Sequence, residues 1–486
     1  MCGVVAIFPY QADAPRVDAG ELGAIRDHMA PRGPDGAESW VADDGRIGLA
    51  HRRLAIIDLS DSAAQPMEID GGRYRIAFNG EIYNYGALRD ELIAQGVQFK
   101  TQSDTEVVLR LYARHGENAV SRLRGMFAFA IWDEAKRGLF VARDPLGIKP
   151  LYYTKNGGTF RLASQVKALM AGGHIETAPD PAGHVGFFLF GHVPDPHTLF
   201  RDIRALPAGH TLWVDEKGVG DPKSYFDVPG ILSEAGNGTT DVSLRDALLD
   251  SVRHHLVSDV PVGVFLSSGI DSSTIAALAA ETHGAGLNTI TLAFAEFEGT
   301  AADEAPLAEE VARIFGTNHQ TKVVAQNDFV AAREHILAAM DQPSIDGVNT
   351  YFVAKAAADA GLKVALSGLG GDELFGGYDT FRQVPKLVGA LGGIPGMGVL
   401  GRAFRIVAAP VATRLTSPKF AGLLEYGTRY GDAYLLRRGL YAPWELPTVL
   451  DPDFAALGWN TLEARLRLED AHSGISDPRK KIAALE

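Results

Sequence analysis

The sequence VGVFLSSGIDSS, residues 262–273, decides the fold of the second half of this chain. Its first five residues form a short apolar run typical of a buried strand, and the Ser/Gly turn after them leads into a helical pattern at 274–282. The flanking sequence repeats this order, with helices predicted at 244–256 and 305–315 and strands at 288–295, 321–325 and 362–368. Strands that alternate with helices need crossover connections, so this half is predicted to be α/β, with a doubly wound parallel sheet.

The first half has a different rhythm, in which short strands dominate. Apolar, partly alternating runs predict strands at 4–8, 73–80, 126–133 and 138–144. Helical patterns lie at 85–94 and 105–115. Ser103 and Asp104 are candidate caps for the second helix. The mixture predicts a layered α+β domain.

Length and composition limit the classes of protein that this chain can be. With 486 residues it is too long for a single core, and we expect a first domain at 1–214, a linker at 215–240 and a second domain at 241–486. The net charge of -14 argues against nucleic-acid partners and against binding to an anionic membrane. No apolar run is long enough to span a bilayer, and the start MCGVVAIFPY lacks the basic region of a signal peptide, so we expect a cytoplasmic location.

Cys2 is the only cysteine, which excludes an internal disulfide and a cysteine-based zinc site. Methionine aminopeptidases remove Met1 when the next side chain is small, as it is here. The mature chain would then carry a thiol and a free α-amine on one residue. That amine, with a reference pKa of about 8, can serve as the base that activates the thiol. Taken alone, Cys2 could equally be an ordinary buried cysteine beside a strand.

Six further motifs follow Cys2 in order: PRGPDG (31–36), HRRLAIID (51–58), FNGEIYN (78–84), SDTEV (103–107), RGMFAFAIWD (124–133) and RDPLGIKPLYY (143–153). With Cys2, they resemble the class II glutaminase domain of glutamine amidotransferases of the asparagine synthetase type. The resemblance implies an N-terminal-nucleophile αββα sandwich that hydrolyses glutamine. Pro31 stands where the family usually has His.

The same resemblance assigns roles to individual residues. Cys2 would be the nucleophile, and Asn79 and Gly80 would donate to the oxyanion of the tetrahedral intermediate. The glutamine-binding residues that it implies are Arg53 for the α-carboxylate, Asp104 with Glu81 for the α-ammonium, and Ile57 and Asn79. Taken singly, Arg53 or Asp104 would be read as a solvated charge.

Two loops in the second half offer sites for a nucleotide. The first, LSSGIDSS (266–273), presents backbone N–H groups at a helix start and resembles the SGGxDS loop of ATP pyrophosphatases, which have the adenine nucleotide alpha hydrolase-like fold; Ser268 replaces the usual Gly. The second, LSGLGGDELFGGY (366–378), resembles the family's SGxGxDExFGGY segment. The residues implied to bind ATP are Leu266, Ser267, Ser268, Gly269, Asp271, Ser272, Phe294, Ser367 and Gly368. Asp271 and Asp372 are implied to hold Mg²⁺. The alternatives are a serine-capped strand–turn–helix joint and a capped helix start.

The chain departs from the family pattern at Leu369, where asparagine synthetases typically have a Glu that matters for forming the aspartyl-adenylate. Either another carboxylate takes over that role, or the acceptor is not aspartate. We also find no E-x-R-x-P-like motif after Tyr378, although family members usually continue with one, so we expect a C-terminally shortened second domain.

The combined resemblance implies a ligase, a glutamine-dependent asparagine synthetase. Ammonia released through Cys2 would amidate an adenylated aspartate, with loss of AMP and pyrophosphate. Its small-molecule partners would be glutamine, ATP with Mg²⁺, and aspartate or another carboxylate. Three alternatives stay open: amidation of a sugar uronic acid in surface-polysaccharide synthesis, a glutaminase with an impaired synthetase half, and a non-catalytic nucleotide-sensing protein. The oligomeric state, with a homodimer as one option, also stays open.

Overall fold

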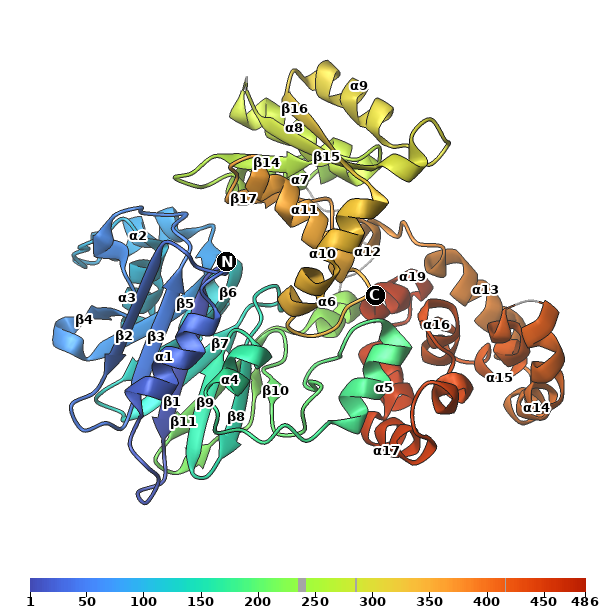
Figure 1. Cartoon of the computed structure of the whole chain (residues 1–486), viewed down its shortest axis with the longest axis horizontal. Helices are drawn as coiled ribbons and strands as arrows, with labels where there is room; N and C mark the ends of the chain where they lie inside the picture. The colour runs from blue at the N-terminus through green and yellow to red at the C-terminus, as the bar shows by residue number, and fades with distance from the viewer. Residues whose placement is uncertain (235–241, 285, 416) are drawn as a thin grey trace.

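A computed structural model describes residues 1–234, 242–284, 286–415 and 417–486. Three parts can be followed in Figure 1: a two-sheet sandwich that contains the N-terminus, a unit built on a parallel sheet, and a group of helices that ends at the C-terminus. Among these described residues, no helix is both long and apolar enough to cross a membrane.

The sandwich consists of two antiparallel sheets. The first has the order β10-β8-β9-β1-β3-β2, from β1 (Gly3–Pro9), β2 (Gly36–Val41), β3 (Gly48–Arg53), β8 (Tyr152–Asn156), β9 (Thr159–Ala163) and β10 (Arg204–Ala205). The second has the order β12-β11-β7-β6-β5-β4, from β4 (Met67–Ile69), β5 (Tyr74–Ile82), β6 (Gly125–Asp133), β7 (Gly138–Arg143), β11 (His210–Asp215) and β12 (Gly218–Val219), with β13 (Lys223–Ser224) paired to β11.

Side-chain alternation along β1 explains why the sheets are layered. Val4, Ala6 and Phe8 point into the core between the two sheets, where they meet residues such as Trp132. The intervening Val5 packs on the other face, against α1 (Ala19–His28) and α4 (Val166–Ala171). The outer face of the second sheet is covered by α2 (Tyr85–Ala94) and α3 (Asp104–His115). The predicted αββα sandwich is therefore confirmed.

The second unit contains a four-stranded parallel sheet of order β16-β15-β14-β17. Its strands are β14 (Val262–Phe265), β15 (Asn288–Phe294), β16 (Asn318–Val324) and β17 (Val364–Leu366). On one face lie α7 (Leu244–His255), α8 (Ile270–His283) and α9 (Ala305–Phe315), and on the other lies α11 (Gly347–Asp359). The predicted doubly wound α/β fold is confirmed, and the two candidate nucleotide loops follow β14 and β17.

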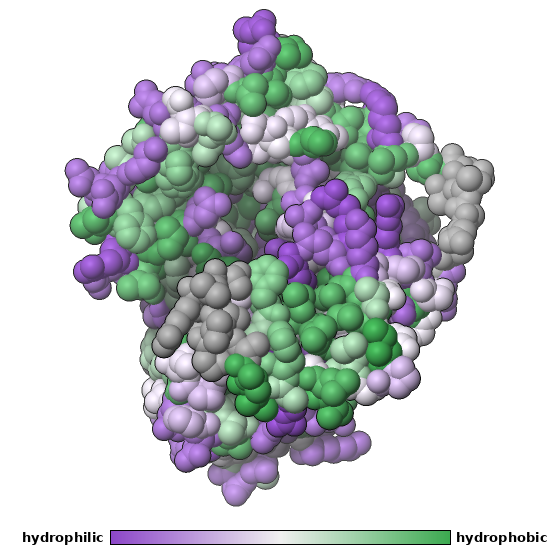
Figure 2. All heavy atoms as spheres, turned by 90° about the vertical axis from the view of Figure 1, so that its right-hand side faces the viewer, coloured by the Kyte–Doolittle hydropathy of each residue, from purple (hydrophilic) through white to green (hydrophobic). Residues whose placement is uncertain are grey.

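Helices form the rest of the chain. They are α5 (Pro181–Phe190), α6 (Val228–Glu234), α10 (Gln326–Ala339), α12 (Gly371–Phe375), α13 (Thr380–Leu391), α14 (Met397–Leu415), α15 (Leu423–Tyr426), α16 (Tyr430–Arg438), α17 (Pro452–Leu462), α18 (Ala464–Ala471) and α19 (Pro478–Leu485). Helix α5 leaves the sandwich and packs on α17, which joins the first half of the chain to its end. Figure 2 views this C-terminal side and shows apolar residues gathered among polar ones; exposed Val399, Leu400 and Phe404 lie on α14.

Two sequence predictions need correction or restriction. Helix α8 begins at Ile270, four residues before the predicted start, because the Ser272 hydroxyl accepts a hydrogen bond from Ser267 N at 3.1 Å and ties the first turn to the end of β14. The predicted linker, 215–240, contains β12, β13 and α6, and its residues 235–240 lie outside the described part of the chain. The exact domain boundaries stay a prediction.

Candidate active site

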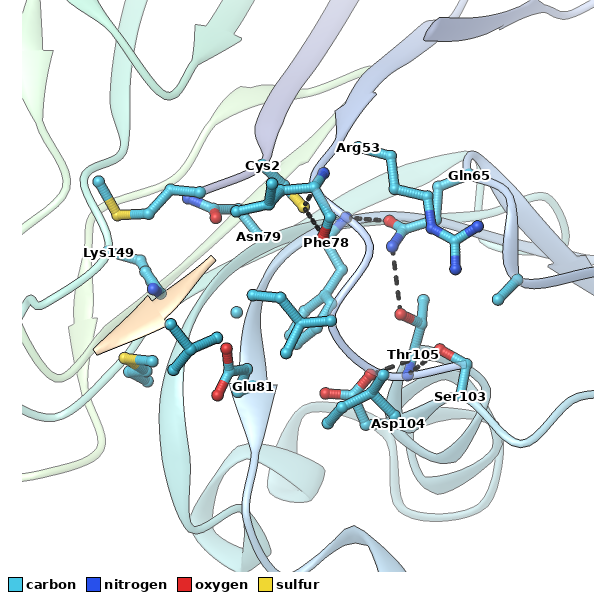
Figure 3. Close-up of a pocket in the computed structure, with 18 of the residues that line it drawn as sticks. Cys2, Arg53, Gln65, Phe78, Asn79, Glu81, Ser103, Asp104, Thr105 and Lys149 are labelled. Carbon is cyan, nitrogen blue, oxygen red and sulfur yellow. Dashed lines mark hydrogen bonds between the residues drawn. The ribbon is translucent and has the colours of Figure 1, made fainter. Parts of the chain in front are cut away.

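A pocket of about 200 Å³ opens beside Cys2, which is large enough for a molecule of amino-acid size (Figure 3). Every residue predicted to bind or hydrolyse glutamine lines it: Cys2, Arg53, Ile57, Asn79, Gly80, Glu81 and Asp104. The wall also includes Val364 and Ala365, from the start of β17 in the other unit, and Lys363, which directly precedes that strand. The pocket therefore lies where the sandwich meets the parallel sheet.

The Cys2 thiol lies just before β1 and is held by the backbone of Leu54. Leu54 N donates to Sγ at 3.3 Å, and Sγ donates to Leu54 O at 3.6 Å. Burial raises the pKa of the thiol, so it needs a base to ionise. The pocket-lining residues that the structure describes include no histidine, and burial lowers the pKa of nearby His51 to about 4, while its Nε2 donates to Phe78 O. The site thus favours a non-histidine base.

The side-chain amide of Asn79 is a hydrogen-bond donor without an acceptor among the described residues. The residue is 1% exposed, and its Nδ2 has no hydrogen-bond partner among the described residues. An unsatisfied buried amide costs about 1–3 kcal/mol, so this site is suited to receive an acceptor atom. A side chain at neighbouring Gly80 would come within 2.4 Å of Met126 O on the paired strand β6, which excludes any residue but glycine.

Two buried carboxylates face the same pocket. Burial raises the pKa of Glu81 to about 7; Lys149 opposes this shift and Asp104 adds to it. Burial also raises the pKa of Asp104 to about 6, although Asp104 accepts a hydrogen bond from Ile82 N at 3.0 Å. Burial makes the charged form of each carboxylate unfavourable, and a nearby cation stabilises that form. The pair therefore favours the binding of a cation such as an ammonium group.

Arg53 anchors the loop that covers the pocket. Its guanidinium donates to Ser60 O at 2.9 Å and to Asp58 O. Asp58 adopts a left-handed conformation with φ of 52°, and its side chain accepts hydrogen bonds from Ser60 and from Gln102 N. Arg53 thus has a structural role beside the predicted one, and Ile57 lies in the loop that it holds.

The first nucleotide loop is organised by its own hydroxyl groups. Ser267 Oγ lies 2.8 Å from Ser272 Oγ and accepts a hydrogen bond from Gly269 N at 3.1 Å, while Leu266 O accepts one from Thr291 Oγ1 at 2.6 Å. Ser268 needs no special backbone conformation here, since the non-glycine residues with positive φ in the described chain are Asp58, Asp70, Arg137 and Glu463. Serine can therefore replace the usual glycine without strain.

The second loop packs directly on the first. A Cβ on Gly368 would lie 3.0 Å from Ser272 N, and one on Gly371 would lie 2.4 Å from the carboxylate of Asp271. Burial raises the pKa of Asp271, and the charges of Asp372 and Glu373 raise it further. Asp271 and Asp372 are thus close, as two ligands of a hard cation bound to phosphates would be. No group of three or more His, Cys, Asp or Glu suited to a metal occurs in the described part of the chain.

Phe294, another predicted ATP-binding residue, is the last residue of β15, the strand that pairs with β14. It pairs with Val324 at the end of β15, and its ring meets Phe297 edge-on at 6.1 Å. Ser367 belongs to the second loop, where its Oγ accepts a hydrogen bond from Leu369 N at 3.2 Å.

Sequence reasoning missed several residues that line the Cys2 pocket. Gln65 bridges Thr105 Oγ1 at 3.1 Å and Phe78 N at 2.7 Å. Lys149 is 6% exposed, and Figure 3 shows it at the pocket near Cys2 and Glu81. Lys149 belongs to the motif RDPLGIKPLYY (143–153), where a basic side chain among apolar neighbours could have indicated a site residue. Lys363 carried no local signal.

Comparisons with known proteins agree with this geometry. Residues 1–226 match the family model "Glutamine amidotransferase domain", and residues 243–468 match "Asparagine synthase". Asparagine synthetase [glutamine-hydrolyzing] 1 of Bacillus subtilis is 40% identical over 387 residues, which cover 79% of this chain and 60% of the relative. A putative asparagine synthetase [glutamine-hydrolyzing] 2 of Methanocaldococcus jannaschii is 32% identical over 448 residues, covering 84% of this chain and 85% of the relative. The match therefore spans 85% of the length of one relative and only 60% of the length of the other.

Proposed function

Because the chain belongs to the family of glutamine-hydrolysing asparagine synthetases, we propose that it is a ligase that transfers the amide nitrogen of glutamine to the side-chain carboxylate of aspartate, driven by ATP. One observation carries the proposal: strand β17 contributes Val364 and Ala365 to the wall of the Cys2 pocket, and the same strand leads into the loop that carries Asp372. Ammonia released at Cys2 is thereby set free at the boundary of the second unit.

In the first half-reaction, the Cys2 thiolate attacks the side-chain amide of glutamine. The α-amine that Cys2 gains on removal of Met1 takes the thiol proton, which suits a pocket without a lining histidine. Asn79 Nδ2 and Gly80 N donate to the oxyanion. Glutamine is held by Arg53 at its α-carboxylate and by Glu81 with Asp104 at its α-ammonium. The protonated α-amine returns that proton to the amide nitrogen as the C–N bond breaks, so that ammonia leaves. Water then hydrolyses the thioester to glutamate and restores the thiol.

In the second half-reaction, the aspartate carboxylate is activated as an adenylate, with release of pyrophosphate, and ammonia displaces AMP. The loop at Ser267–Ser272 provides backbone N–H groups and hydroxyls for the phosphates, at the start of α8. Asp271 and Asp372 are the residues that would hold Mg²⁺, which supplies positive charge to the phosphates. The close contact of the two loops supports a shared role in binding one nucleotide.

Aspartate is the acceptor that the relatives' names support. Leu369 is 92% exposed at the second loop, so it neither fills the site nor brings a charge to it. The role of the family's Glu would then fall to another carboxylate, for which Glu373 is a candidate because its charge acts on Asp271. The cytoplasmic location and the homodimer stay predictions.

The test measures three products together: glutamate, pyrophosphate and asparagine. The proposal expects pyrophosphate release that requires aspartate, and a Cys2→Ala variant that makes asparagine from ammonium chloride but not from glutamine. If the wild-type chain forms glutamate yet releases no pyrophosphate with aspartate, the proposed ligase activity is wrong.

A further inference from the structure

We propose that Asp259 and Lys363, both in the second unit, are positioning residues of the glutaminase site, which they serve by holding the segment 54–58 against the Cys2 thiol. The inference rests on the proposed function. It assigns to two residues outside the sandwich an effect on glutamine hydrolysis, and it does not concern the passage of ammonia.

The segment 54–58 forms the wall of the pocket next to the nucleophile. Leu54 exchanges both of its backbone hydrogen bonds with the Cys2 thiol, at 3.3 and 3.6 Å. Ile56 and Ile57 line the same pocket. A shift of this segment would therefore change both the direction of the thiol and the shape of the glutamine site.

Asp259 holds one end of the segment with a pair of hydrogen bonds. Its backbone N donates to Ile56 O at 3.0 Å, and its Oδ2 accepts from Asp58 N at 2.7 Å. Asp58 is the residue in the left-handed conformation, φ 52°, so its N–H is aimed at the second unit by a backbone arrangement that most residues avoid. Neighbouring contacts to Arg53 and Gln102 keep Asp58 in that arrangement.

Lys363 holds the other end through Asp35. Lys363 Nζ donates to Asp35 Oδ2 at 2.7 Å, and the same oxygen accepts from Ala55 N at 2.8 Å. Ala55 directly follows Leu54. Two hydrogen bonds therefore link the ammonium of Lys363 to Ala55, the neighbour of Leu54, and Leu54 in turn holds the Cys2 thiol. Lys363 itself also lines the pocket.

The two holding residues sit at equivalent places in the parallel sheet. Asp259 lies three residues before β14, and Lys363 lies directly before β17. The strands are neighbours, with Val262 opposite Val364. Their other ends lead into the two nucleotide loops, and each strand is only about 10–13 Å long at about 3.3 Å per residue. The segment 54–58 is therefore attached to the near ends of the strands whose far ends carry Asp271 and Asp372.

The experiment compares glutaminase kinetics in four variants of the two attachment residues and one control variant, all in the full chain. Asp259→Ala and Lys363→Met remove the two attachments, whereas Asp259→Asn and Lys363→Arg keep an acceptor and a cation in place. Asp250→Asn is the matched control, because the ion pair between Arg124 and Asp250, 2.5 Å long, also joins the two units but does not touch segment 54–58. Ammonia-dependent asparagine formation reports on the second unit alone.

We expect Asp259→Ala and Lys363→Met each to lower kcat for glutamine hydrolysis about 5- to 100-fold, in the range seen for misplaced catalytic groups and coupled sites. We expect the conservative variants to recover most of that loss, and ammonia-dependent synthesis and Asp250→Asn to be unchanged. Alkylation of Cys2, the only cysteine, by iodoacetamide should slow in parallel with kcat.

Unchanged glutamine kinetics in both attachment variants would overturn the inference. An equal loss in Asp250→Asn would also overturn it, by showing a general loosening of the interface. If Asp259→Ala or Lys363→Met fails to fold, Asp259→Ser, whose side chain is too short to reach Asp58 N, and Lys363→Gln, which lacks the cation, take their place, and unchanged glutamine kinetics in both would overturn the inference. A wild-type chain that forms no glutamate contradicts the proposed function instead, so the two failures can be told apart.

Discussion

Glu81 and Lys149 line one pocket with opposite charges, and burial shifts the pKa of both toward their neutral forms. The pKa of Glu81 stands at about 7, and that of Lys149 is lowered by burial, which its attraction to Glu81 and Cys2 partly offsets. The charge state of this pocket therefore changes near neutral pH, and glutamine binding should depend on it.

The first prediction concerns the pH dependence of glutamine hydrolysis. The α-ammonium of glutamine needs Glu81 and Asp104 ionised, and burial makes each carboxyl take up its proton at a higher pH than in water. We expect kcat/KM to fall as the pH falls through about 7 and then about 6. The measurement is the pH profile of glutamate formation. An acidic limb at the ordinary carboxylate pKa, about 4.3, would contradict this role of the pair.

The second prediction concerns the variant Lys149→Met, which lacks an ammonium group that lowers the pKa of Glu81. In Lys149→Met, burial and Asp104 still raise the pKa of Glu81, and only the N-terminal amine is left to lower it, so the acidic limb of the profile should move to higher pH. Lys149→Arg keeps the charge and should leave the limb in place. A limb that moves to lower pH, or does not move, would show that Lys149 does not act on Glu81.

The third prediction concerns the unpartnered amide of Asn79. Asn79→Ala removes the donor that we assign to the oxyanion, which typically costs about 10²–10³ in kcat with little change in KM. The Nδ2 group has no partner among the described residues, so its loss should not lower the free energy of unfolding. Steady-state kinetics and thermal unfolding check both halves. A large rise in KM with kcat unchanged would instead place Asn79 in ground-state binding.

The fourth prediction tests the contact between the two nucleotide loops. In Gly371→Ala the new methyl group would meet the Asp271 carboxylate at 2.4 Å, so the carboxylate must leave its present position in the loop contact. We expect pyrophosphate release to fall at least tenfold, on the order of 1.4 kcal/mol, while glutamate formation is retained. Gly389→Ala is the control, because a Cβ there meets nothing within 4 Å. Equal activity in the two variants would contradict the assignment of Asp271 to the phosphate site.

Local sequence patterns were enough to predict most of the fold. The strand at 4–8 is β1 (Gly3–Pro9), an apolar run that is buried along its whole length. The helix at 305–315 is α9 (Ala305–Phe315), in which Ala308 and Ala312, one turn apart, are buried. The start of α8 was missed because its first turn depends on the side-chain bond between Ser272 and Ser267 N, which periodicity does not report.

The glutamine-binding residues could be predicted from the sequence, but the residues of the second unit that complete the pocket wall could not. Asn79 and Asp104 stand in short motifs, and the structure brings them to one pocket. Lys363 reaches that pocket through an ion pair with Asp35, which lies 328 residues away in the chain. Contacts of that kind depend on how the two units pack together, and the spacing of residues within a motif does not predict this packing.

In the proposed reaction, the nitrogen freed at Cys2 reaches the acceptor at the second unit. The most direct test supplies glutamine labelled with ¹⁵N in its side-chain amide, together with ATP, Mg²⁺, aspartate and an excess of unlabelled ammonium. We expect asparagine whose side-chain amide carries mainly ¹⁵N, and none of that label in asparagine made by Cys2→Ala. Labelled ammonium in solution with no labelled asparagine would contradict it.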